Sequence, residues 1–133
     1  MLPTLTTLFW VGLGSAIGGM GRYSVSLWVQ RQFPHEFPWG TLAVNVVGSF
    51  VIGFLAMLSG NEGHWMSHPN AQRFFIVGLL GGFTTFSSFS LQTLQLAQQG
   101  HHGLAIGNVL LSVLSCLLFV WMGAGVANKI VLR

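Results

Sequence analysis

The sequence is poor in charge of either sign. Only 5% of its 133 residues are Asp, Glu, Lys or Arg, whereas soluble globular domains carry roughly 25%. Hydrophobic residues make up 52% of the chain, and the mean hydropathy is +0.68. Such a chain cannot cover a water-facing surface, so the composition predicts an integral membrane protein with one small domain over residues 1–133. The net charge of +3 comes from scattered basic residues, which excludes the basic patch of a nucleic-acid-binding protein.

Carboxylates are scarcer still. Glu36 and Glu62 are the only acidic residues, and both fall in expected loops. Proton-coupled transporters and cation pores usually place carboxylates within the membrane, and hydrolytic enzymes usually need an acid/base pair. The sequence therefore argues against an enzyme. It also argues against a small multidrug exporter, which would exchange protons for cationic drugs through a membrane-embedded glutamate.

Metal-binding side chains are few and lie outside the expected spans. Cys116 is the only cysteine, which excludes a disulfide within the chain and argues against a thiolate metal site. The five histidines lie in expected loops: His35, His64, His68, His101 and His102. We interpret the adjacent pair at 101–102 as polar loop residues, because neighbouring side chains diverge.

Four hydrophobic segments are long enough to cross the hydrocarbon core, which takes about 20 apolar residues per helix. We expect spans at 5–29, 40–59, 74–97 and 104–128. The connections between them are short and polar, and they hold prolines at 34, 38 and 69, where no helical hydrogen bond is lost. The predicted fold class is an all-α bundle of four transmembrane helices in the cell (inner or plasma) membrane.

The basic residues give only a weak signal for orientation. In a four-span chain, the N-terminus, second loop and C-terminus share one side, which holds Arg73, Lys129 and Arg133. The other side holds Arg31 and, if it reaches the interface, Arg22. So small a positive-inside bias fits two alternatives. Either the chain has one orientation that charge does not reveal, or it inserts both ways up and pairs antiparallel.

Small residues spaced by four predict close contacts between helix backbones in lipid. Glycine pairs occur at 14/18 and 103/107, and Ser49 pairs with Gly53 in the same spacing. These contacts can lie within one chain or between two copies, and the spacing does not choose between them.

The polar residues inside the expected spans are neutral and rich in donors. They are Asn45, Ser49, Thr84, Thr85, Ser87, Ser88, Ser90, Thr93, Asn108, Ser112 and Ser115. Hydroxyls and amides can donate hydrogen bonds to an anion, and the edge of a phenylalanine ring is the positive end of its quadrupole. Phe83, Phe86 and Phe89 recur at three-residue spacing, so one helix is expected to present ring edges beside hydroxyls. An aromatic stripe also arises from packing, but together with these donors it favours an anion pathway. A non-conducting assembly subunit would need neither.

Gly81-Gly82 followed by Thr84-Thr85 predicts an interruption of the third span. Irregular backbone at membrane depth survives where it is buried in protein or lines a cavity, and its freed carbonyls can bind a hard cation. An unbroken helix with glycines at a packing face would have a similar sequence. Arg22, the one charge within a span, either extends to the interface or provides a fixed positive charge in a pore vestibule.

Three segments, in order, resemble motifs of the CrcB/Fluc family of fluoride channels. They are "GGMGRY" at 18–23, "GTLAVNVVGSFVIG" at 40–53 and "GLLGGFTTFSSFS" at 78–90. Length and four-span layout agree as well, so the resemblance covers nearly the whole chain. It implies a channel that lets cytoplasmic fluoride leave passively and so reduces fluoride toxicity. It also implies an antiparallel, dual-topology homodimer with a structural sodium ion at its centre.

The resemblance further implies roles for individual residues. The backbone carbonyls of Gly81 and Thr84 would bind the sodium ion, and Arg22 would lie in the vestibule. The fluoride pore would be lined by Asn45, Phe86, Phe89, Ser87 and Ser88, whereas Phe83 becomes a packing residue. The fourth helix departs from the family pattern at "NVLLSVLSC" (108–116), where relatives read NVxxNxxGS. Ser112 and Ser115 are therefore weaker candidates for a polar track, and Cys116 receives no role.

Overall fold

The structure is a computed structural model that describes residues 4–33, 36–61 and 63–131. Every regular element in these ranges is helical, which confirms the predicted all-α class. The long helices are α1 (Leu5–Gln32), α2 (Trp39–Ser59) and α6 (His102–Val131). Between α2 and α6 the chain forms η1 (Trp65–Ser67), α3 (Pro69–Gln72), the π-helical η2 (Arg73–Leu80), α4 (Gly81–Phe83) and α5 (Phe86–Gln98).

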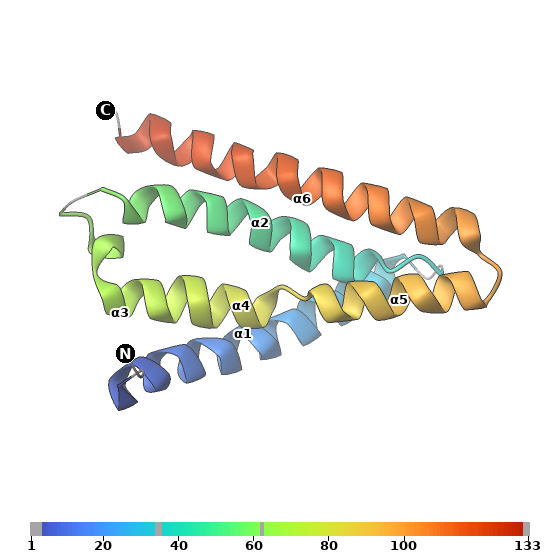
Figure 1. Ribbon diagram of the computed structural model, residues 1–133, viewed down its shortest axis with the longest axis horizontal. Helices are drawn as coiled ribbons and strands as arrows, with labels where there is room; N and C mark the ends of the chain where they lie inside the picture. Colours follow the sequence, from blue (N-terminus) through green and yellow to red (C-terminus); the bar gives the residue numbers. More distant parts are fainter. Residues whose placement is uncertain (1–3, 34–35, 62, 132–133) are drawn as a thin grey trace.

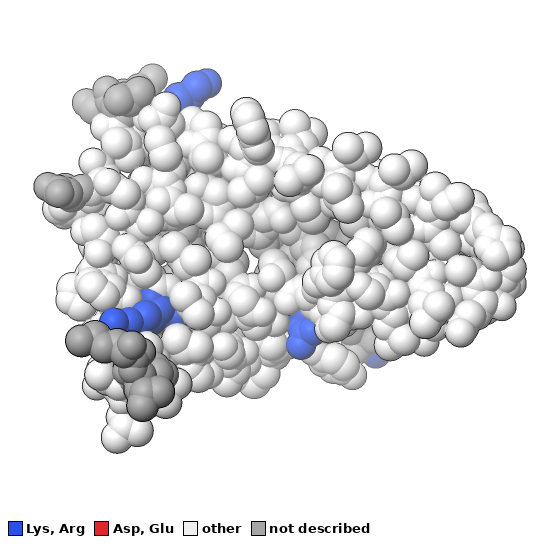
Figure 2. Space-filling model, viewed as in Figure 1, with Lys and Arg blue, Asp and Glu red and all other residues white. Residues whose placement is uncertain are grey.

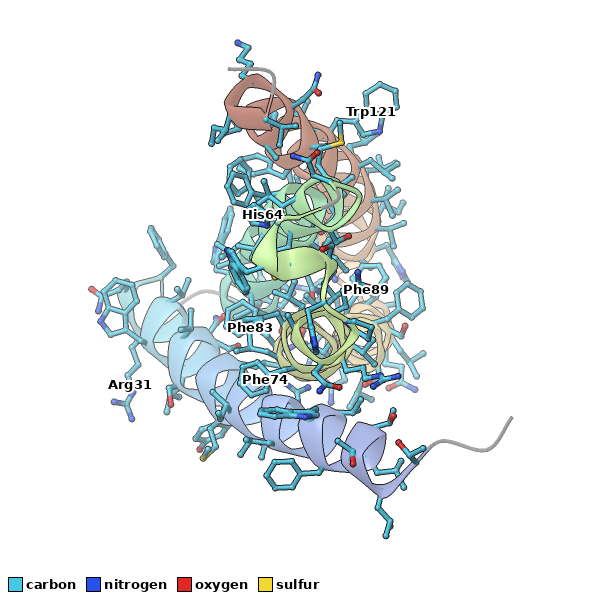
Figure 3. The ribbon with its side chains drawn as sticks, turned by 90° about the vertical axis from the view of Figure 1, so that its left-hand side faces the viewer. Arg31, His64, Phe74, Phe83, Phe89 and Trp121 are labelled. Carbon is cyan, nitrogen blue, oxygen red and sulfur yellow. The ribbon has the colours of Figure 1, made fainter. Side chains whose placement is uncertain are left out.

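The helices run up and down beside one another, and α1 crosses the others obliquely (Figures 1 and 3). Both termini and the connection from α2 to α3 lie at one end of the molecule (Figure 1). The α1–α2 and α5–α6 connections lie at the other end. Successive long segments therefore point in opposite directions, as in a chain that crosses a membrane repeatedly.

Three helical segments are long and apolar enough to cross a membrane: Trp39–Ser59, Pro69–Gln98 and His102–Val131. Helix α1 covers the expected span 5–29 but is not among these three, so the fourth crossing stays a prediction. Large apolar side chains point outward, and Trp121 is 79% exposed. Charged side chains are sparse and isolated on the face that Figure 2 shows. The chain has the surface of a multi-pass membrane protein.

Glycines let helix backbones meet directly. A Cβ atom on Gly14 or Gly18 of α1 would overlap the backbone of η2, in the latter case at the Leu79 carbonyl. The predicted pair at 14/18 is therefore a tight contact within one chain. A Cβ atom on Gly103 or Gly107 would meet nothing within 4 Å, so that pair makes no such contact in the described part of the chain.

In the α2–α6 contact, glycines allow a close approach of the two backbones at two positions. A Cβ atom on Gly53 would overlap the Val120 carbonyl, and one on Gly123 would overlap the Phe50 carbonyl. The two glycines thus bring each helix against the carbonyls of the other. This contact fixes α6 along α2, and α6 also contacts α5, while most of its large apolar side chains stay exposed.

A small apolar core closes the end of the molecule that holds the termini. Met66 of η1 is fully buried and packs with Leu58 of α2 and Ala127 of α6. His64 and His68 cap η1 and α3, because the Nδ1 atom of each ring accepts the backbone N–H two residues later. These two histidines are structural loop residues, as the sequence indicated.

Candidate ion pathway

The helical backbone is interrupted between α4 and α5. Thr84 (φ −84°, ψ 157°) and Thr85 (φ −152°, ψ 113°) are both extended, and α5 begins at Phe86. Gly81 remains helical. The irregular residues of the Gly-Gly-Phe-Thr-Thr segment are therefore its threonines. The β-branched residues adopt the extended conformation that suits them.

Asn45 of α2 holds this interruption from a neighbouring helix. Its Oδ1 atom accepts a hydrogen bond from the Thr85 N–H (2.8 Å), and its Nδ2 atom donates to the Thr85 carbonyl (3.1 Å). One side-chain amide thus satisfies both backbone groups of Thr85, much as a paired strand would. This use of Asn45 occupies its carbonyl and one of its two amide N–H bonds.

Several backbone carbonyls lose their helical donors at this point, and those of Gly81 and Thr84 are among them. In a continuous α-helix the Thr85 N–H would bond to the Gly81 carbonyl, and the Ser88 N–H would bond to the Thr84 carbonyl. Here Thr85 donates to Asn45 instead, and Ser88 donates to the Thr85 hydroxyl at 3.1 Å. Gly81 and Thr84 are the two residues whose carbonyls were expected to bind sodium. Neutral carbonyl oxygens without helical donors fit a hard cation.

Phe86 and Phe89 form a pair on α5. Their ring centroids lie 5.3 Å apart with the planes inclined by 51°. Phe89 is buried, whereas Phe86 is 76% exposed in the single chain. The two predicted pore rings are thus neighbours, one inside the subunit and one on its outer surface.

Phe83 does not belong to this pair. Its ring lies beside Gly21 of α1 and Gly48 of α2, and Figure 3 shows Phe83 and Phe89 on opposite sides of their segment. The expectation of one stripe through Phe83, Phe86 and Phe89 is wrong. Three-residue spacing places side chains on one face only within a continuous helix, and Thr84 and Thr85 are extended.

Hydroxyl groups gather where α5 begins. The Thr85 Oγ1 atom donates to Ser88 Oγ at 3.1 Å and lies 3.3 Å from Ser87 Oγ. Thr85 is buried, Ser88 is half-buried and Ser87 is exposed. The predicted serines therefore lie together, and Thr85 joins them as the residue that caps α5.

A hollow of about 670 Å³ extends from these hydroxyls toward the α1–α2 connection. Thr85 and Ser88 line it at one side, and Arg22 of α1 lines it as well. The structure thus brings the predicted vestibule arginine and a predicted pore serine to one cavity. Gln30, Thr41 and Glu36 also contribute to the lining.

Sequence reasoning missed the glutamines in and directly after α5. Gln92 and Gln95 of α5 line the hollow, together with Gln99 at the C-terminal cap of this helix. The Oε1 atom of Gln92 is buried and has no hydrogen-bond partner among the residues that the structure describes. The available signal was their spacing of three and four residues, which places side chains on one helix face.

A second polar group joins α5 to α6. The Asn108 Nδ2 atom donates to Thr93 Oγ1 at 2.8 Å, and Ser112 Oγ donates to Asn108 Oδ1 at 3.3 Å. Asn108 is 1% exposed, and Ser112 is buried too. The Ser115 hydroxyl instead donates to backbone carbonyls of its own helix, those of Leu111 and Ser112, and to no polar side chain of the network. Ser112 therefore belongs to a buried polar network, whose centre is Asn108, and Ser115 does not.

We expect Asn45→Leu to destabilise the protein. Both backbone groups of Thr85 would lose their partner, and each buried unsatisfied group costs about 1–3 kcal/mol. The free energy of unfolding in detergent micelles should therefore fall by about 2 kcal/mol or more. Ser90→Ala is the control, since the Ser90 hydroxyl donates only within its own helix, to the Phe86 carbonyl. Equal losses in the two variants would contradict the role given to Asn45.

Comparison with known proteins shows the family to which the chain belongs. Residues 9–124 match the family model described as "CrcB-like protein, Camphor Resistance (CrcB)". The chain is 52% identical over 121 residues to the "Fluoride-specific ion channel FluC" of Methylocella silvestris, covering 91% of this chain and 92% of that protein. Proteins of the same name from Opitutus terrae (90% of both chains covered) and Rhodospirillum rubrum (88% and 91% covered) are 49% and 48% identical. The matched residues include the interruption, Asn45 and Arg22, so the chain belongs to the CrcB-like family.

Proposed function

We propose that this protein is a fluoride-selective channel through which fluoride leaves the cytoplasm down its electrochemical gradient, which reduces fluoride toxicity. The observation that carries the proposal is the group of neutral donors around Thr85, in a chain half identical to proteins named as fluoride-specific channels. The protein is an ion channel and not an enzyme. Fluoride is its transported ion.

The path replaces the hydration water of fluoride with protein donors. Thr85 already donates to Ser88, so the hydroxyl protons of Ser87 and Ser88 are the ones that can turn toward an anion. Asn45 keeps one amide N–H beyond the bond to Thr85. The ring edges of Phe86 and Phe89 add positive potential beside these donors. A small, firmly hydrated anion needs such a narrow, donor-lined path.

The hollow forms the wide entrance to this path. Most of the residues that line it carry an amide or a hydroxyl group, and Arg22 adds a guanidinium. A positive charge in a concave site raises the local concentration of anions. The buried network of Thr93, Asn108 and Ser112 extends the polar surface between α5 and α6.

The functional unit in this proposal is an antiparallel homodimer. Each copy crosses the membrane four times, α1 included, and the α4–α5 interruption lies at membrane depth. Phe86 is 76% exposed and Gly81 is also exposed, so one chain leaves a pore ring and a cation-binding residue uncovered. A second copy inserted the other way up would cover both. The weak charge bias permits both orientations.

The proposal includes a structural sodium ion at the dimer centre, held by the carbonyls of Gly81 and Thr84 from both copies. The loss of their helical donors supports this assignment. When bound, the ion would supply positive charge that holds the interrupted helices together and offsets repulsion between anions.

Purified protein in liposomes loaded with potassium fluoride should release fluoride when a potassium ionophore is added. Release should be much faster than from protein-free liposomes with the same load, because the donors around Thr85 replace hydration water. Matched proteoliposomes loaded with potassium chloride should keep their chloride. A fluoride electrode measures the efflux. Absence of fluoride efflux from correctly folded dimer would contradict the channel function. It would favour the alternative of a non-conducting assembly subunit. Proton-coupled transport of a cationic drug without any fluoride release would point to the exporter.

Phe86→Ile should slow fluoride efflux in the same assay. The isoleucine keeps an apolar side chain but removes the ring edge, and an aromatic contact of about 0.5–1.5 kcal/mol corresponds to roughly a two- to tenfold slower rate. Phe83→Ile is the matched control, since the Phe83 ring packs beside Gly21 and Gly48. Rates are compared per folded dimer. Efflux of Phe86→Ile at the wild-type level would remove the ring edge from the mechanism.

Replacing sodium with a large organic cation at equal ionic strength should lower the thermal stability of the purified protein. A ligand that binds only the folded state adds about 2.7 kcal/mol of stability at a hundred times its dissociation constant. Thermal unfolding in detergent micelles, followed over a series of sodium concentrations, measures the effect. Stability that is independent of sodium would exclude the ion from the proposed site.

A further inference from the structure

We propose that Glu36 and His101 act as a pH-dependent electrostatic gate at the mouth of the hollow. Protonated His101 neutralises the Glu36 carboxylate and lets anions enter, whereas neutral His101 leaves a negative charge that repels them. The inference rests on the proposed function, because fluoride is the ion whose entry the pair regulates.

The pair joins two connections at the same end of the molecule. Glu36 follows α1 and lines the hollow together with Arg22 and Gln99. The Nδ1 atom of His101 contacts the Oε2 atom of Glu36. His101 lies between α5 and α6, and its backbone N–H donates to the Leu96 carbonyl at 2.9 Å. The imidazole is therefore anchored beside the carboxylate.

Both side chains reach water. The side chain of His101 is 35% exposed and that of Glu36 is 57% exposed. Protons can therefore exchange with the bulk solution without any opening of the fold. The energetic value of such an exposed pair to folding is small. Its effect is instead on the charge that an entering anion meets.

Among the residues that the structure describes, the other ionisable groups near the pair include no carboxylate. From α1, Arg22 and Tyr23 line the hollow, and Arg31 lies near the end of that helix. From α6, His102 follows His101 in the chain. The lining residues of α2 and α5 carry no ionisable side chain. Glu36 is thus the only carboxylate among the described residues that line the hollow.

The sign of the effect follows from the charges. Imidazole is the side chain that ordinarily gains and loses its proton between pH 5 and 8. When the imidazole is protonated the pair is neutral overall, and the charge of Arg22 attracts anions. When the imidazole is neutral the carboxylate is unpaired and offsets Arg22. Salt screens exposed charges and so limits the size of the effect. We expect roughly a two- to fivefold faster fluoride entry at the acidic end.

Fluoride efflux from liposomes tests the gate, with the same buffer on both faces at about pH 6 and about pH 8. Protein-free liposomes with the same fluoride load give the rate at which hydrogen fluoride leaks through the lipid, and this rate is subtracted. Wild-type efflux should be faster at the lower pH, and Glu36→Gln should be fast at both. His101→Gln should be slow at both, whereas His101→Arg, a permanent cation, should be fast at both.

His102→Gln is the matched control, since His102 is the adjacent imidazole and forms no ion pair in the described part of the chain. It should keep the wild-type pH response. The proposal is overturned if wild-type efflux does not depend on pH, or if Glu36→Gln keeps the full response. If wild-type protein releases no fluoride at any pH, the proposed function fails instead. All rates are taken from protein that elutes as folded dimer.

Discussion

The pairing of the Asn45 amide with the backbone of Thr85 is the constraint on which the rest of the site depends. Away from water, an unpaired backbone N–H or carbonyl costs several kcal/mol, so an extended residue between two helices needs a partner. A single side-chain amide supplies both halves of that partnership. Without it, Thr84 and Thr85 would regain their bonds most simply by becoming helical, and α4 would continue into α5.

Several features follow from this one contact. The Thr85 N–H donates to Asn45 and no longer to the Gly81 carbonyl. The Thr85 hydroxyl caps α5 by accepting the Ser88 N–H, which in a continuous helix would donate to the Thr84 carbonyl. The same cap brings Ser87 and Ser88 together at the start of α5. The carbonyls proposed to bind sodium and the hydroxyls proposed to bind fluoride thus lie on the two sides of one interruption. Their proximity is a consequence of backbone geometry.

The sequence predicted the parts of the fold that depend on local pattern. The long apolar runs predicted helices, and the Gly-Gly-Phe-Thr-Thr segment predicted where the third one is irregular. Motif resemblance predicted the family, which the comparisons confirm. These features need only residue type and spacing along one element. The proposed roles of individual residues in conduction do not follow from residue type and spacing alone.

What the sequence could not give depends on contacts between elements. Spacing placed Phe83 with Phe86 although the same segment predicted an interruption, because spacing does not show how far the extended Thr84 and Thr85 turn α5 relative to α4. The resemblance gave Asn45 a role toward an ion and no role toward the backbone, since its partner lies forty residues away. Likewise, Gln92 becomes conspicuous only when its buried Oε1 atom is seen in the hollow. Each of these depends on tertiary geometry.

The polar character of α1 has its own explanation in this arrangement. This helix holds Arg22, Ser26 and Gln30, which all line the hollow, and its glycines at 14 and 18 contact the backbone of η2. A helix that lines an aqueous cavity on one side and packs backbone to backbone on another needs fewer apolar side chains than one surrounded by lipid. The low apolarity of α1 therefore comes from the residues that line the hollow and from its packing glycines, while large apolar side chains such as Phe9 and Ile17 stay exposed. In the proposed channel, α1 forms the polar wall opposite the glutamines of α5.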